Sequence, residues 1–161
     1  MSTSTSTPKP VSGELAALQA ALGAEHAAIY GYGVVGGRIL QARRKEAREA
    51  YDAHRARRDQ LVRAVRDLGG APEAAAAAYA LPFPVPDSAA AVRLAAELEE
   101  RVAGVYSDLV RASTAERRRL AAEALREAAV RSVRWSGESV AFPGLAERVA
   151  AVPTASATPR T

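Results

Sequence analysis

Apolar residues recur along the chain at the three- and four-residue spacing of amphipathic helices, and this pattern is present in four stretches. The first covers residues 13–42, and the second follows a charged joint at 43–46 and ends at 68–70. The third begins at Asp87 or Ser88, both good helix caps, and reaches about residue 111, and the fourth ends at about residue 135. Between the second and third, residues 71–86 contain four prolines, so we predict an extended connection with a short helical turn over 74–78.

The order of these elements predicts a fold class. One long crossover between the second and third helices of a four-helix bundle is the connectivity of ferritin-like folds, whereas simple up-and-down bundles have three short loops. We therefore predict an all-α, ferritin-like four-helix bundle over residues 13–150. Residues 1–12 and 151–161 are rich in Ser, Thr, Pro and Ala and show no helical periodicity, so we expect them to be disordered tails.

Three of the predicted helices carry an ionisable residue in the middle of their apolar stripe. Glu25 lies in the stripe of the first helix, His54 in that of the second and Glu99 in that of the third. Burying a carboxylate costs several kcal/mol unless a metal, a cation or hydrogen-bond donors compensate it. One such residue on each of three helices predicts a polar site inside the bundle.

Composition narrows the chemistry of that site. The chain of 161 residues has no cysteine, which excludes disulfides, thiolate metal sites and cysteine nucleophiles. No apolar run is long enough to span a bilayer, and the N-terminal residues lack the hydrophobic stretch of a secretory signal, so we expect a cytoplasmic protein without a membrane partner. The preference for Ala and Arg is typical of bacterial proteins from GC-rich genomes.

Several segments of the sequence resemble a known family. The segments concerned are residues 24–33, 54–59, 81–85 and 142–145, together with Trp135. They are similar to a ferritin-like domain of unknown function found in actinobacterial proteins, and the resemblance covers residues 13–145. It implies the ferritin-like fold and leaves the activity open.

The wider ferritin-like superfamily supplies a ligand pattern for comparison. Its di-iron members carry one Glu on each of two helices and a Glu-x-x-His motif on each of the other two. By this resemblance Glu25 and Glu99 match the single glutamates, and His54 matches one histidine, but Tyr51 stands where its glutamate would be. On the fourth helix both ligands are missing, and Arg131 occupies the histidine position. The resemblance therefore implies a degenerate, mostly eroded di-iron-type site.

Two functional hypotheses follow, and whether the chain is an enzyme stays open. In the first, Arg131 neutralises the carboxylates together with Arg58, if Arg58 turns inward, while Tyr51 and His54 complete a buried hydrogen-bonded network. The protein is then a non-catalytic structural or interaction module. In the alternative, Glu25, His54 and Glu99 hold one Fe, Mn or Zn ion, and the chain is a metal-binding protein or oxidoreductase.

The charged surface adds a last expectation about partners. Residues 38–66 contain ten Lys or Arg against four Asp or Glu. Without interleaved aromatic residues or a recognised reading motif, this is more typical of a solvated, ion-paired helix face than of a nucleic-acid site. A homodimer is compatible with the Ala- and Gly-rich faces of the first and fourth helices.

Overall fold

The computed structural model describes residues 11–138, and this part of the chain is built from helices without any strand. The elements are α1 (Val11–Arg38), the short 3-10 helix η1 (Gln41–Arg43), α2 (Arg44–Asp67), α3 (Ser88–Ala112) and α4 (Ala115–Ser136). The predicted all-α architecture with one long connection between the second and third long helices is confirmed.

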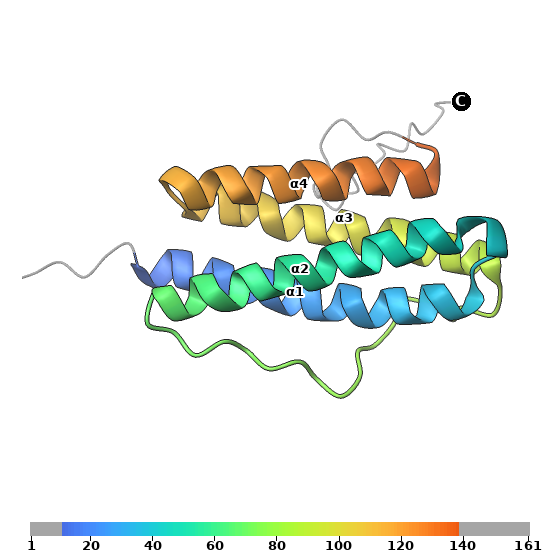
Figure 1. Cartoon of the computed structure of the whole chain (residues 1–161), viewed down its shortest axis with the longest axis horizontal. Helices are drawn as coiled ribbons and strands as arrows, with labels where there is room; N and C mark the ends of the chain where they lie inside the picture. The colour runs from blue at the N-terminus through green and yellow to red at the C-terminus, as the bar shows by residue number, and fades with distance from the viewer. Residues whose placement is uncertain (1–10, 139–161) are drawn as a thin grey trace, which may run out of the picture.

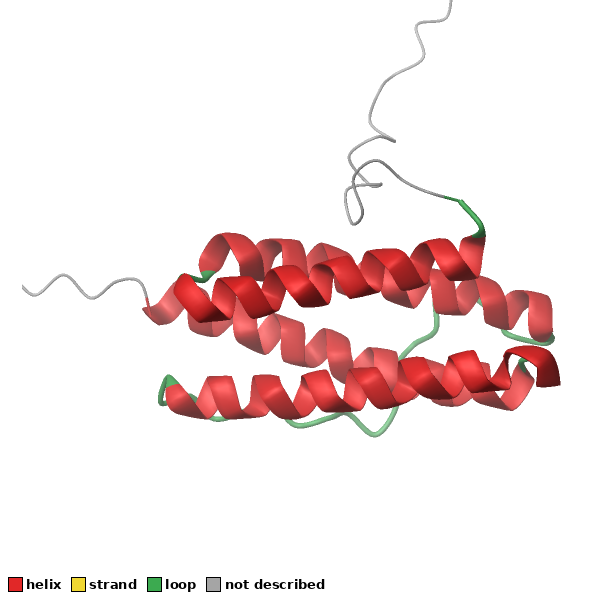
Figure 2. Cartoon of the chain, turned by 45° about the horizontal axis from the view of Figure 1, so that its top comes forward, coloured by secondary structure: helices red, strands yellow, loops and turns green. Residues whose placement is uncertain are grey.

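The direction of the helices follows from that connection. Figure 1 shows α1 and α2 as one antiparallel pair and α3 and α4 as a second, with the crossover running back along the length of the bundle so that α2 and α3 are parallel. α1 packs against both α2 and α3, and α3 also packs against α4. The tilted view in Figure 2 shows the long helices lying lengthwise beside one another in one bundle.

The core consists of two apolar clusters, one toward each end of the bundle. One cluster is centred on Leu22, Val65 and Leu109, and the other on Tyr32, Val35 and Leu94. On α2, α3 and α4 the site residues His54, Glu99 and Arg131 lie between residues of these two clusters, and on α1 Glu25 lies between Leu22 and Ala28 of the first cluster. The apolar clusters therefore close the site off at both ends.

Local interactions explain where the connections begin and end. The Asp87 side chain accepts a hydrogen bond of 2.8 Å from the backbone N–H of Ala90 and caps α3. The crossover is fastened to α1 by Gln19, whose amide contacts Ala71 O at 2.6 Å and accepts from Glu73 N at 3.0 Å. These contacts hold the start of the crossover in a fixed, extended path beside α1.

The structure corrects some predicted boundaries. α1 begins at Val11, so residues 11 and 12 belong to a helix rather than to the predicted tail 1–12, and it ends at Arg38 rather than near 42. The predicted turn over 74–78 is not helical. The rest of the predicted tails (1–10 and 151–161) and the last part of the predicted bundle (139–150), with the segment 142–145, lie outside the described residues. Within residues 11–138 no helix is long and apolar enough to cross a membrane.

Candidate functional site

His54 lies at the centre of a buried charged cluster. Its side chain is fully buried, with Nδ1 2.7 Å from Glu25 Oε2 and Nε2 3.1 Å from Glu99 Oε1. An ionised carboxylate only accepts hydrogen bonds, so both ring nitrogens have to donate, and an imidazole has two N–H donors only when it is protonated. The geometry therefore calls for a positively charged His54 between two negatively charged glutamates.

The local electrostatics agree with this protonation state. Burial by itself lowers the pKa of His54, but the hydrogen bonds and charges of Glu25 and Glu99 outweigh it and raise that pKa to about 9. Burial also opposes the ionisation of Glu99, yet His54 and Arg131 together hold the pKa of Glu99 below its usual value. At neutral pH both residues are thus charged.

Arg131 on α4 supplies the second positive charge. Its Nε donates to Glu99 Oε1 at 2.8 Å, and its side chain is 17% exposed, more than any other member of the cluster. Two carboxylates, one imidazolium and one guanidinium leave the cluster electrically neutral. A paired arrangement of this kind lowers the cost of burying each ion, which is large when an ion is buried alone.

Two tyrosines complete the hydrogen bonding of the carboxylates. Tyr32 Oη donates to Glu99 Oε1 and Tyr106 Oη donates to Glu25 Oε1, each at 2.6 Å. Burial and the neighbouring glutamates raise the pKa of both hydroxyls well above the usual value, so they stay protonated donors. Trp135 Nε1 in turn donates to Tyr32 Oη at 2.8 Å, which ties the end of α4 to the cluster.

The predicted site did not include these two tyrosines, although the sequence contains a signal for both. Tyr32 follows Glu25 by seven positions on α1, and Tyr106 follows Glu99 by seven on α3. Because the two helices are antiparallel, each tyrosine reaches the glutamate of the other helix (Figure 1). The repeated Glu-x6-Tyr spacing therefore marks a reciprocal cross-link between α1 and α3.

The structure places the other predicted site residues differently. It brings Glu25, His54, Glu99 and Arg131 together. Within the described residues, Tyr51 and Arg58, the other two predicted partners, form no hydrogen bond or ion pair with these four. Arg58 instead pairs with its neighbour Asp59 at 2.7 Å. Tyr51 is only partly buried, and its ring faces Arg55 at 5.8 Å. The α2 arginine that does reach across the bundle is Arg57, which pairs with Glu127 of α4 at 2.9 Å.

The donor set does not fit a single ion held by Glu25, His54 and Glu99. The two glutamates lie at opposite nitrogens of the imidazole, so an ion bound at Nε2 would meet Glu99 but not Glu25. Within residues 11–138 no group of three or more His, Cys, Asp or Glu side chains is arranged to hold a metal ion. Glu99 Oε2 is the one carboxylate oxygen of the cluster without a hydrogen-bond partner in this part of the chain.

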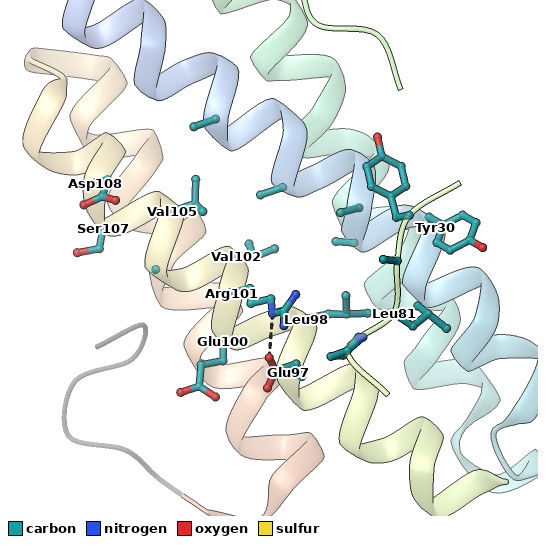
Figure 3. Close-up of a pocket in the computed structure, with 18 residues that line it drawn as sticks. Tyr30, Leu81, Glu97, Leu98, Glu100, Arg101, Val102, Val105, Ser107 and Asp108 are labelled. Atoms are coloured by element: carbon teal, nitrogen blue, oxygen red, sulfur yellow. Dashed lines mark hydrogen bonds and ion pairs between the residues drawn. The ribbon is translucent and has the colours of Figure 1, made fainter. Parts of the chain in front are cut away.

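Several hollows lie around the bundle in the described part of the chain. A groove of about 760 Å³ runs between α1 and α3 and is bordered by the crossover (Figure 3). A smaller hollow of about 270 Å³ lies between α2 and α4 and is lined by Arg131, Glu127 and Trp135. Arg131 is therefore a member of the cluster that also borders solvent, on the α2–α4 side.

Comparison with known proteins places the chain in a family. The chain is similar to the crystal structure of a conserved hypothetical protein, rv2844, from Mycobacterium tuberculosis, with 38% sequence identity and a TM-score of 0.78. This similarity covers 80% of the present chain and 98% of the other. No curated protein matches the chain. A family model described as a domain of unknown function (DUF4439) matches residues 17–147, which is most of the chain, and the protein therefore belongs to that family.

Proposed function

We propose that this protein is a non-catalytic helical module of ferritin-like ancestry, in which side-chain cations have replaced the metal of an ancestral site, and that it acts by binding a protein partner. The observation that carries the proposal is the position of the His54 ring, with one carboxylate at each nitrogen. A protonated imidazole has no free lone pair and does not ligate a metal. In this proposal the protonated ring of His54 fills the space between the two glutamates.

The hydrogen-bond network supports a structural role for the cluster. Members on α1, α2, α3 and α4 contact one another only in a single register of the four helices, because each donor reaches its acceptor over a short distance. Buried polar groups can specify one packing arrangement among several that an apolar core would tolerate. The cluster is thus suited to holding the helices in register while the outer surface of the bundle binds the protein partner.

Metal content is the experiment that tests the proposal. The protein is purified without an affinity tag or chelator, loaded anaerobically with Fe(II), Mn(II) or Zn(II), desalted and measured by inductively coupled plasma mass spectrometry. We expect far less than one metal ion per chain, and the same low value in the His54→Ala and Glu25→Ala variants. The His26→Ala variant is the matched control, because His26 is the other histidine of the chain and contacts the crossover rather than the cluster.

The alternative is one Fe, Mn or Zn ion held at the cluster, and the unpartnered Glu99 Oε2 is the observation that favours it. This ion would require His54 to lose its proton and either Glu25 or the imidazole ring to move. Near-stoichiometric metal that is lost in His54→Ala but kept in His26→Ala would establish that alternative and overturn the proposal. Metal lost in both histidine variants would point to nonspecific binding by imidazoles.

A further inference from the structure

The groove between α1 and α3 has the dimensions and lining of a helix-binding groove. Its α1 side is formed by the small side chains of Ala20, Ala24 and Ala27, and its α3 side by Val102 and Val105. The lining extends over eleven residues of α1 (20–30) and twelve of α3 (97–108), which at 1.5 Å per residue is roughly three helical turns. Alanine leaves room for the backbone of an incoming helix to approach closely.

The rim of this groove is acidic. Glu97, Glu100 and Asp108 of α3 line it, against the single basic residue Arg101 (Figure 3). Arg101 pairs with Glu97 at 2.8 Å and Arg111 pairs with Asp108 at 2.6 Å, whereas Glu100 has no ion pair within the described residues. Glu100 therefore leaves one uncompensated negative charge at the rim, in a chain whose formal net charge is +4, and this charge favours an occupant that brings positive charge beside an apolar face.

The outer face of α4 has the complementary properties. Val130 and Val133 are 43% and 37% exposed, and they are among the few large apolar side chains that the described part of the chain leaves at the surface. Arg126 and Arg134 are exposed beside them, and neither forms an ion pair within residues 11–138. This face therefore offers an apolar strip flanked by two arginines.

We propose that the groove is occupied by α4 of a second copy of this chain, an inference that rests on the interaction role proposed above and names its partner. Helix-in-groove packing buries Val130 and Val133 against the alanines of α1, and Arg126 and Arg134 face the acidic rim. The groove lies on the α1–α3 side, while Val130 borders the hollow between α2 and α4 on another side. The two surfaces of one copy are different, so the contact is head-to-tail and continues from copy to copy.

A mixing experiment tests this contact. Ala27→Trp fills the groove and leaves α4 intact, whereas Arg126→Glu damages α4 and leaves the groove intact. Molar mass is measured by light scattering after size-exclusion chromatography, at low and at high protein concentration and in low and high salt. Circular dichroism and thermal melting verify that each variant is folded, and Ala24→Trp, which fills the same groove, replaces Ala27→Trp if that variant does not fold.

The head-to-tail geometry predicts a specific result. The wild-type mass grows beyond that of a dimer with concentration, and less so in high salt. Each variant alone stays monomeric, and the equimolar mixture forms a one-to-one heterodimer that does not grow, because only one intact groove and one intact α4 face can meet. A wild-type monomer at every concentration, a wild-type species that stops at a dimer, or a mixture without a heterodimer overturns the inference. The metal measurement does not depend on self-association. If the protein is metal-free and does not self-associate, the second copy is rejected as the partner, and the proposed function is not.

Discussion

At the scale of the residue, the protonation of His54 is the property that holds the cluster together. The ring is an acceptor-free cation only while it carries both protons, and its two partners are carboxylates that have no proton to give. Loss of one proton would leave a nitrogen lone pair facing a carboxylate oxygen at hydrogen-bonding distance, which is repulsive. The stability of the fold is thereby linked to pH.

We expect the free energy of unfolding to fall as the pH rises from 6.5 to about 9. Folding raises the pKa of His54 from 6.5 to about 9, so the native state holds this proton more tightly than the unfolded chain does. The stabilisation is complete below pH 6.5 and is lost as the pH approaches 9. At about 1.4 kcal/mol for each pH unit, the loss is roughly 3 kcal/mol.

Urea denaturation at several pH values measures this effect, as the difference between wild type and His54→Gln. His26→Ala is the control and should keep the wild-type slope, because His26 lies outside the cluster. An equal pH dependence in wild type and His54→Gln would show that His54 is not a buried cation.

Replacing Arg131 by methionine should destabilise the protein by about 3 kcal/mol, since it leaves Glu99 buried with one counter-charge fewer. Arg63→Met on α2 is the control, because Arg63 is exposed and forms no ion pair within the described residues, and it should change the stability by about 0.5 kcal/mol or less. Chemical denaturation of both variants is the measurement. Adding Glu99→Gln to Arg131→Met should recover part of the loss, and a strictly additive result would argue against a coupled charge pair.

Part of this cluster follows from the sequence and part does not. Polar residues in an apolar stripe identify Glu25, His54 and Glu99, because the helical period alone decides which residues face inward. The period does not decide which long side chain turns toward the site, and so Arg57 rather than Arg58 reaches across to α4. That choice depends on helix rotation and on rotamers set by neighbouring helices.

At the scale of the element, α1 and α3 approach each other closely at Gly31. A Cβ atom placed on Gly31 would lie 2.5 Å from Leu98 Cδ1, so α3 approaches α1 where α1 has no side chain. At Gly33, two positions further along, such a Cβ would meet nothing within 4 Å. The glycines of α1 therefore differ in purpose, although they read alike in the sequence.

The pair Gly31→Ala and Gly33→Ala should separate these two cases. Gly33→Ala should raise the free energy of unfolding by up to about 1 kcal/mol, the gain of alanine over glycine inside a helix. Gly31→Ala has the same gain but forces the Leu98 side chain to move, at a cost of about 1 kcal/mol, the low end for overpacking, so it should leave the protein less stable than Gly33→Ala. Thermal melting of both variants compares them, and identical melting temperatures would contradict the close approach.

At the scale of the whole molecule, the crossover decides the topology, and this was predictable because four prolines prevent residues 71–86 from forming a helix. The path of the crossover was not predictable. It depends on Gln19 and His26, two polar residues of α1 that bind the backbone at Ala71 and Glu73. The same crossover borders the α1–α3 groove, so the connection both sets the helix order and shapes the surface that we propose to bind a partner.

The pairing of charges in the cluster has a consequence for how the chain can be divided. Glu25 and His54 belong to the antiparallel pair α1–α2, and Glu99 and Arg131 belong to α3–α4. Each carboxylate thus has a counter-ion within the same helical pair. The residues that each pair contributes to the cluster carry no net charge. We expect two fragments separated within residues 71–86 to complement each other when mixed, because neither half brings an uncompensated charge to the junction. In this respect the protein consists of two complementary helical pairs that the crossover links covalently.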